Sequence, residues 1–131
     1  MNISKIRTNI IALQKRRLDL EYILIRSRKK MEPGSLIKVF TSCRKGNCKC
    51  TKGEKHGPFL YLNQKIDSKY SQRYIGKESD KPTVKRVQAY MDFQDTLAIL
   101  RKINKEIDSL LNLYRNTMSV TPKKNDWFRD K

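Results

Sequence analysis

Near the N-terminus, apolar residues recur at alternating steps of three and four. The series is Ile3, Ile6, Ile10, Leu13, Leu20 and Leu24, with Arg17 in its one polar slot. This spacing predicts a helix of about 28 residues with a narrow apolar seam, which Pro33 and Gly34 end. Beside the seam lies a second apolar row, formed by Ile11, Leu18, Tyr22 and Ile25. The helix can therefore face more than one neighbour.

The same spacing returns in the second half of the chain, after Pro82, a residue that suits the first turn of a helix. Its apolar positions are Tyr90, Phe93, Leu97, Leu100, Ile107, Leu111, Tyr114 and Met118. Asn104 takes the single polar slot, and an antiparallel hairpin of the two helices would bring it level with Arg17, where a polar pair would set the register. The alternative is a coiled coil between two chains, giving a homodimer.

Between the helices the pattern changes to short runs of β-branched and aromatic residues. Residues 35–40, 59–62 and 70–75 read as strands, and the last two flank a turn at 66–69. The fold class is therefore predicted as α+β, with two long helices flanking a small antiparallel sheet of about three strands. One domain is expected over residues 1–118, followed by a flexible tail over 119–131, where the apolar period is lost.

Charge narrows the choice of partner. Lys and Arg number 30 against 13 Asp and Glu, a formal net charge of +17, which attracts polyanions. Nucleic acid is the expected partner, DNA before RNA, and no small-molecule substrate is expected. No run of ~20 apolar residues and no signal-peptide pattern is present, so we expect a protein of the host-cell cytoplasm with no membrane partner.

All three cysteines and the single histidine lie in one short stretch. Cys43, Cys48, Cys50 and His56 follow the spacing C-x4-C-x-C-x5-H, and four such ligands suit a structural, tetrahedral zinc ion. Glycines in the same stretch supply the tight turns that wrapping an ion requires. The alternatives are free thiols, a Cys43–Cys48 disulfide, or a catalytic zinc.

Catalysis is the least favoured of these alternatives. A catalytic zinc needs a general base beside it, and Glu54 is the only carboxylate in the stretch. The histidine is assigned to the metal, and neither a phosphate-binding Gly-rich loop nor a paired-carboxylate motif occurs. The sequence therefore predicts that the protein is not an enzyme.

The candidate phosphate contacts fall into two groups. The first surrounds the metal ligands, where a rigid loop presents cations: Arg44, Lys45, Lys49, Lys52 and Lys55. The second is assigned to the first helix, where it can equally be a solvated face: Lys15, Arg16, Arg17, Arg28, Lys29 and Lys30. Three tyrosines of the hairpin are candidates either for stacking on unpaired bases or for cross-strand packing: Tyr61, Tyr70 and Tyr74.

The run GSLIKVFTSCRKGNCKCTKGEKHGPFLYL, followed by RYIGKE, resembles a family of small uncharacterised proteins of prokaryotes, their viruses and mobile elements. The shared motifs are G-S-L, C-x4-C-x-C, G-E-x-H-G-P and R-Y, over about residues 33–115. The chain departs from the family pattern at Arg44-Lys45, where a Gly-Lys-Pro run is common. The resemblance implies a domain of unknown function, often encoded beside transposase or integrase genes, and supplies no activity.

Two functions follow from these patterns. The first is a zinc-stabilised nucleic-acid-binding protein, a regulator or accessory factor of a virus or mobile element. The second is a helical dimerisation, adaptor or assembly protein, in which zinc only stabilises the centre of the fold.

Overall fold

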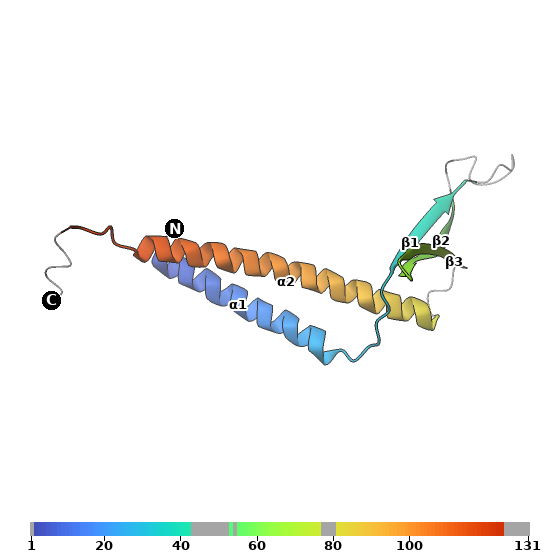
Figure 1. Cartoon of the computed structure of the whole chain (residues 1–131), viewed down its shortest axis with the longest axis horizontal. Coiled ribbons are helices and arrows are strands. Elements are labelled where there is room, and N and C mark those ends of the chain that lie inside the picture. Colours follow the sequence, from blue (N-terminus) through green and yellow to red (C-terminus); the bar gives the residue numbers. More distant parts are fainter. Residues whose placement is uncertain (1, 43–52, 54, 77–80, 125–131) are drawn as a thin grey trace. The chain divides into compact units, whose positions relative to one another are not determined.

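The computed structural model of the chain describes residues 2–42, 53, 55–76 and 81–124. Within these ranges, helix α1 (Ile3–Arg26) is followed by strands β1 (Ser35–Thr41), β2 (His56–Ile66) and β3 (Lys69–Gly76) and by helix α2 (Pro82–Met118), as Figure 1 shows. The strands form one antiparallel sheet in the order β1-β2-β3. The predicted α+β class, with a helix on each side of the sheet in sequence, is confirmed.

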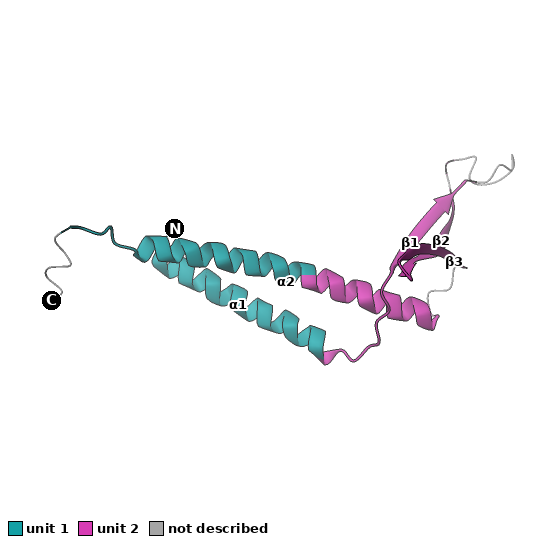
Figure 2. Cartoon of the chain, viewed as in Figure 1, with its two compact units in different colours: residues 1–25, 98–131 teal, residues 26–97 magenta. Residues whose placement is uncertain are grey.

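The chain divides into two compact units, coloured separately in Figure 2. The first unit comprises Met1–Ile25 and Ala98–Lys131, and the second comprises Arg26–Leu97. Helix α2 contributes its C-terminal part to the first unit and its N-terminal part to the second.

The first unit is a pair of helices with a narrow apolar core. Its buried residues come from the predicted seams or lie beside them: Ile6, Ile10, Leu100, Ile103 and Ile107. The Arg17 Nη1 group donates a hydrogen bond to Asn104 Oδ1 at 3.3 Å. The predicted level pairing of these two residues is therefore confirmed, and here the helices pair within one chain.

Helix α1 ends earlier than its apolar period predicts. It stops at Arg26, so Arg28, Lys29 and Lys30 lie in the linker to β1 and not on a helix, which corrects the expectation from the sequence. Farther along the linker, the Glu32 N–H donates a hydrogen bond to the Arg86 carbonyl of α2 at 3.1 Å. Glu32 also precedes Pro33, and the proline ring disfavours a helical backbone at the residue before it. Tertiary bonding and Pro33 thus hold the linker in a non-helical path.

The second unit is built on the sheet. Strand β2 is central and begins at His56, three residues before the predicted start, while the predicted turn is confirmed between Ile66 and Lys69. The two turn residues, Asp67 and Ser68, have φ angles of 50° and 67°, as a two-residue hairpin of the I′ type requires.

One face of the sheet packs on α2. Leu60 and Leu62 alternate onto this face and are buried, as are Val84 and Val87 of the helix. The Leu36 N–H also approaches the Met91 sulfur at 3.4 Å, joining β1 to α2. A sheet of this size needs such a partner, because three short strands bury too little on their own.

Glu32 joins three parts of the second unit. Its carboxylate accepts hydrogen bonds from Arg86 Nε of α2 at 3.1 Å and from Gln64 Nε2 of β2 at 2.5 Å. The Gln64 amide also donates to the Pro33 carbonyl at 3.0 Å and accepts from Arg73 of β3. The linker, the sheet and the start of α2 are therefore connected through one half-buried acid, whose side chain is 29% exposed.

This network makes stability depend on pH. The hydrogen bond from Gln64 lowers the pKa of Glu32 below its ordinary value of 4.5, and Arg86 and Arg73 lower it further, against an opposing effect of burial. A carboxyl with a lowered pKa stabilises the fold above its unfolded-state pKa, and this contribution is lost as the pH falls through the lowered value. We predict that acidification through this range lowers the Tm of the unaltered protein more steeply than that of Glu32→Gln, measured by circular dichroism.

Glu21→Gln is the matched control, because Glu21 is an exposed acid of α1 paired with Arg17 at 3.6 Å. It is expected to leave the pH dependence of the Tm close to that of the unaltered protein. Equal pH dependence in Glu32→Gln and the unaltered protein would contradict the role given to this network.

Candidate functional site

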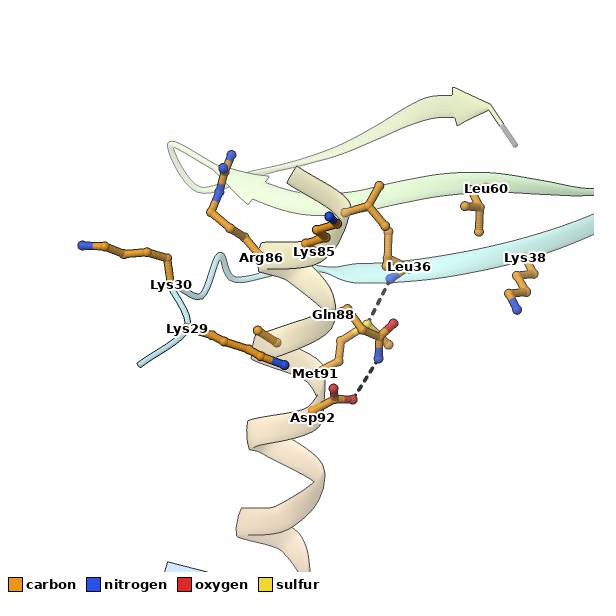
Figure 3. Close-up of a pocket in the computed structure, with 12 residues that line it drawn as sticks. Lys29, Lys30, Leu36, Lys38, Leu60, Lys85, Arg86, Gln88, Met91 and Asp92 are labelled. Atoms are coloured by element: carbon orange, nitrogen blue, oxygen red, sulfur yellow. Dashed lines mark hydrogen bonds between the residues drawn. The ribbon is translucent and has the colours of Figure 1, made fainter. Parts of the chain in front are cut away.

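The second unit contains a cavity of about 790 Å³, within the size range of small-molecule sites (Figure 3). Its walls come from the linker, β1, β2 and the first turns of α2. The apolar part of its lining consists of Leu36, Leu60, Val84, Ala89 and Met91, and the polar part of Lys29, Lys30, Lys38, Lys85, Arg86, Gln88 and Asp92.

Strand and helix periods explain why these side chains meet. Leu36 and Lys38 lie two residues apart on β1, so both face α2, and the strand register places Lys38 opposite Leu60. On α2 the lining residues other than Arg86 are related by steps of three and four, which places them on one broad side of the helix. The cavity therefore has an apolar floor with cations around its mouth.

The charge of the lining is strongly unbalanced. Five of its side chains are cationic and one, Asp92, is anionic. Arg86 is paired with Glu32, and Asp92 accepts a hydrogen bond from Gln88 at 2.9 Å. The ammonium groups of Lys29, Lys30, Lys38 and Lys85 form no ion pair with another described residue. This set, which we call the lysine rim, leaves the mouth of the cavity positive.

Of the basic residues predicted from the sequence, Lys29 and Lys30 belong to the lysine rim. Lys15 and Arg16 are exposed on α1 in the first unit, and Arg28 is exposed in the linker. Arg17 is held by its bonds to Asn104 and Glu21. Lys55 is exposed just before β2, while Arg44, Lys45, Lys49 and Lys52 lie outside the described residues.

Sequence reasoning missed Lys38, Lys85 and Arg86, although Lys38 and Lys85 each carry a signal. Lys38 interrupts the apolar run Leu36–Phe40, on the side that Leu36 also occupies. Lys85 lies in the first turn of α2, where cations oppose the helix dipole and where no acidic residue is present. Cations at positions that the fold does not favour indicate a local need for positive charge.

The predicted metal ligands fall mostly beyond the described chain. Cys43, Cys48 and Cys50 lie outside it, whereas His56 opens β2 and pairs in register with Thr41 near the end of β1. Gly57 follows with a φ of 137°, and a Cβ atom there would approach the Val39 carbonyl oxygen to 2.8 Å. The two strands thus bring both ends of the cysteine-bearing segment to neighbouring positions.

The face of the sheet turned away from α2 carries aromatic rings. Tyr61 and Tyr74 pack across strands with ring centroids 5.4 Å apart, and Phe59 lies 6.2 Å from Tyr74. Lys65 lies 5.6 Å from the centre of the Tyr70 ring. Cross-strand packing, one of the two roles expected for these tyrosines, is therefore present for Tyr61 and Tyr74.

Fold and cavity define a small α+β protein with a cation-rimmed, apolar-floored pocket, and none of its described helices is long and apolar enough to cross a membrane. The chain belongs to the family described as a domain of unknown function, DUF6788, which matches residues 10–86. This match starts and ends earlier than the region of resemblance expected from the motifs, and it ends within α2, before the lining residues Gln88, Ala89, Met91 and Asp92. No curated protein and no solved structure matches the chain.

Proposed function

We propose that the protein is a basic nucleic-acid-binding protein stabilised by zinc, acting as a regulator or accessory factor of a virus or mobile element. The lysine rim carries this proposal, because four lysines without a described ion pair gather at one cavity. The whole chain adds to the same field, with 30 basic against 13 acidic residues. Such a surface binds the phosphates of DNA, or as second choice those of RNA, and the binding is favoured by the release of counterions from the phosphates.

The fold supports this role by fixing the cations in position. Lys38 lies on a strand and Lys85 on a helix, while Lys29 and Lys30 enter from a linker that Glu32 fastens to α2. Cations held on connected elements bind phosphates with less ordering cost than cations on a free chain. Such contacts position a nucleic acid and give affinity, without a catalytic step.

Zinc is proposed to close the segment between β1 and β2. Three thiolates and one imidazole are ligands that zinc prefers, and the pairing of Thr41 with His56 supports a short closed loop that starts and ends at the same end of the β1–β2 pair. Its cations would then be presented on a rigid support beside the ligands: Arg44, Lys45, Lys49, Lys52 and Lys55.

One prediction of this proposal concerns the salt dependence of nucleic-acid binding. Replacing the four lysines of the rim by Gln is expected to weaken binding to DNA and to flatten the plot of log K against log salt, by up to about 0.9 for each lost contact with duplex DNA. Fluorescence anisotropy at several salt concentrations measures both effects. The matched control replaces four exposed lysines that do not line the cavity, Lys5, Lys102, Lys123 and Lys124. An unchanged slope in the rim variant, or no binding by the unaltered protein at low salt, contradicts the proposal.

A second prediction concerns the metal. Purified protein should contain one zinc per chain by elemental analysis, and Cys48→Ser should lose it. Removal by a chelator should lower the Tm and the strand signal in circular dichroism, because structural zinc contributes folding free energy directly. Absence of zinc from freshly purified protein, or an unchanged Tm after verified loss of zinc, sinks the structural role.

One observation favours the second candidate function, a dimerisation or adaptor protein. The second apolar row of α1 remains exposed, with Ile11 62%, Leu18 67%, Tyr22 57% and Ile25 79% accessible. These residues recur at steps of seven, four and three, as in a coiled-coil seam. The row is separate from the seam that contains the buried Ile6 and Ile10, so it can bind another helix without opening the first unit.

We predict that Leu18→Glu abolishes self-association if this row pairs two chains. Light scattering at high concentration should change from dimer to monomer, while the Tm changes little, because Leu18 is exposed. Ile23→Glu is the control, since Ile23 is also exposed on α1 but lies outside the seven-four-three series. A monomeric unaltered protein removes the self-assembly form of this function.

A further inference from the structure

We infer that the cavity of the second unit is a nucleotide pocket, which takes one unpaired base on its apolar floor while the lysine rim binds the adjoining phosphates. The inference rests on the proposed function and makes it more specific: the preferred ligand becomes a single strand with an accessible base. Figure 3 shows the arrangement, with cations entering from the linker, β1 and α2 around an apolar centre.

The floor fits the flat face of a base. Leu36, Val84 and Met91 come from both walls, so an inserted ring would contact aliphatic and thioether groups on either side. Burial of an apolar ring surface releases water, and the soft Met side chain adapts to a planar ligand. A cavity of about 790 Å³ has room for a base with part of its sugar.

The rim fits more than one anionic group. Lys29 and Lys30 stand on the linker, Lys38 stands on β1 and Lys85 on α2, so the cavity has cations on three sides of its lining. In Figure 3, Lys29 extends toward Met91, whereas Lys30 extends outward from the linker. A single carboxylate, such as that of a fatty acid, leaves most of these ammonium groups unpaired. Successive phosphates of a strand pair with several of them at once, and charge complementarity therefore favours a nucleotide chain over an anionic lipid.

Gln88 and Asp92 add a polar edge to the apolar floor. They are bonded to each other at 2.9 Å on one side of α2, and together they offer an amide and a carboxylate to a ligand. The Asp92 carboxylate can accept hydrogen bonds from the exocyclic amino groups of adenine, cytosine and guanine. The Gln88 amide offers both a donor and an acceptor, and it matches a base edge that carries both. An acyl chain uses neither group.

A duplex does not satisfy this pocket. Paired bases are stacked inside the helix, and their faces reach a pocket only after unpairing and unstacking, which costs free energy. Unpaired bases are free to enter, as in proteins that bind single strands through a positive groove and apolar or aromatic contacts. The chemistry of the cavity thus selects single-stranded over double-stranded nucleic acid.

The test compares two fluorescent single strands of about ten nucleotides, one of mixed sequence and one of equal length with abasic sites throughout. Both carry the same phosphates, so only the bases differ. The unaltered protein is expected to bind the mixed-sequence strand about tenfold more tightly, as measured by anisotropy. Ala89→Leu fills the cavity from α2 and should abolish that difference, while the affinity for the abasic strand stays the same.

Ala98→Leu is the matched control, because it makes the same change on an exposed part of α2 that does not line the cavity. Leu is a good helix former, so both variants should keep the unaltered Tm. If Ala89→Leu lowers the Tm, Gln88→Leu at an exposed position of the lining replaces it; this change removes the amide of the polar edge and should reduce the base preference.

Three outcomes overturn the inference. Equal affinity of the unaltered protein for the two strands removes the base pocket and leaves the proposed nucleic-acid binding intact, whereas failure to bind either strand removes both. A base preference that survives Ala89→Leu and Gln88→Leu but disappears in Tyr74→Ala assigns the bases to the outer aromatic face of the sheet, where Tyr74 packs on Tyr61, and not to the cavity.

Discussion

The second unit depends on the carboxylate of Glu32. Three strands and one end of a helix bury a small core, so polar contacts must decide how the linker, sheet and helix meet. Glu32 accepts hydrogen bonds from Arg86 and Gln64, and its backbone N–H donates to α2 as well. Because the acid is half buried, these charged hydrogen bonds are stronger than they would be on an open surface.

The same contacts shape the cavity. Glu32 draws the linker onto α2, and the linker carries Lys29 and Lys30 to the mouth. Glu32 also pairs with Arg86, so one of the five cations of the lining is neutralised within the protein. The four lysines of the lysine rim have no such pair among the described residues. The carboxylate of Glu32 therefore helps to set the position of the basic linker residues.

Much of the fold could be predicted from local patterns. The period of three and four located both helices, the Arg17–Asn104 pair set their register, and the hairpin turn was placed at the correct residues. The end of α1 was misplaced, because the bond between Glu32 and α2 acts across 54 residues of sequence. The predicted metal ligands Cys43, Cys48 and Cys50 lie beyond the described residues, and the zinc site stays a prediction.

Sequence by itself determined the elements and the net positive charge of the chain, since helical and strand periods and the excess of Lys and Arg are local or additive properties. Tertiary structure alone decided where the cations gather. Lys29 and Lys38 belong to neighbouring segments, whereas Lys85 lies far along the chain on α2, and only the packing of the sheet on α2 brings them around one apolar floor.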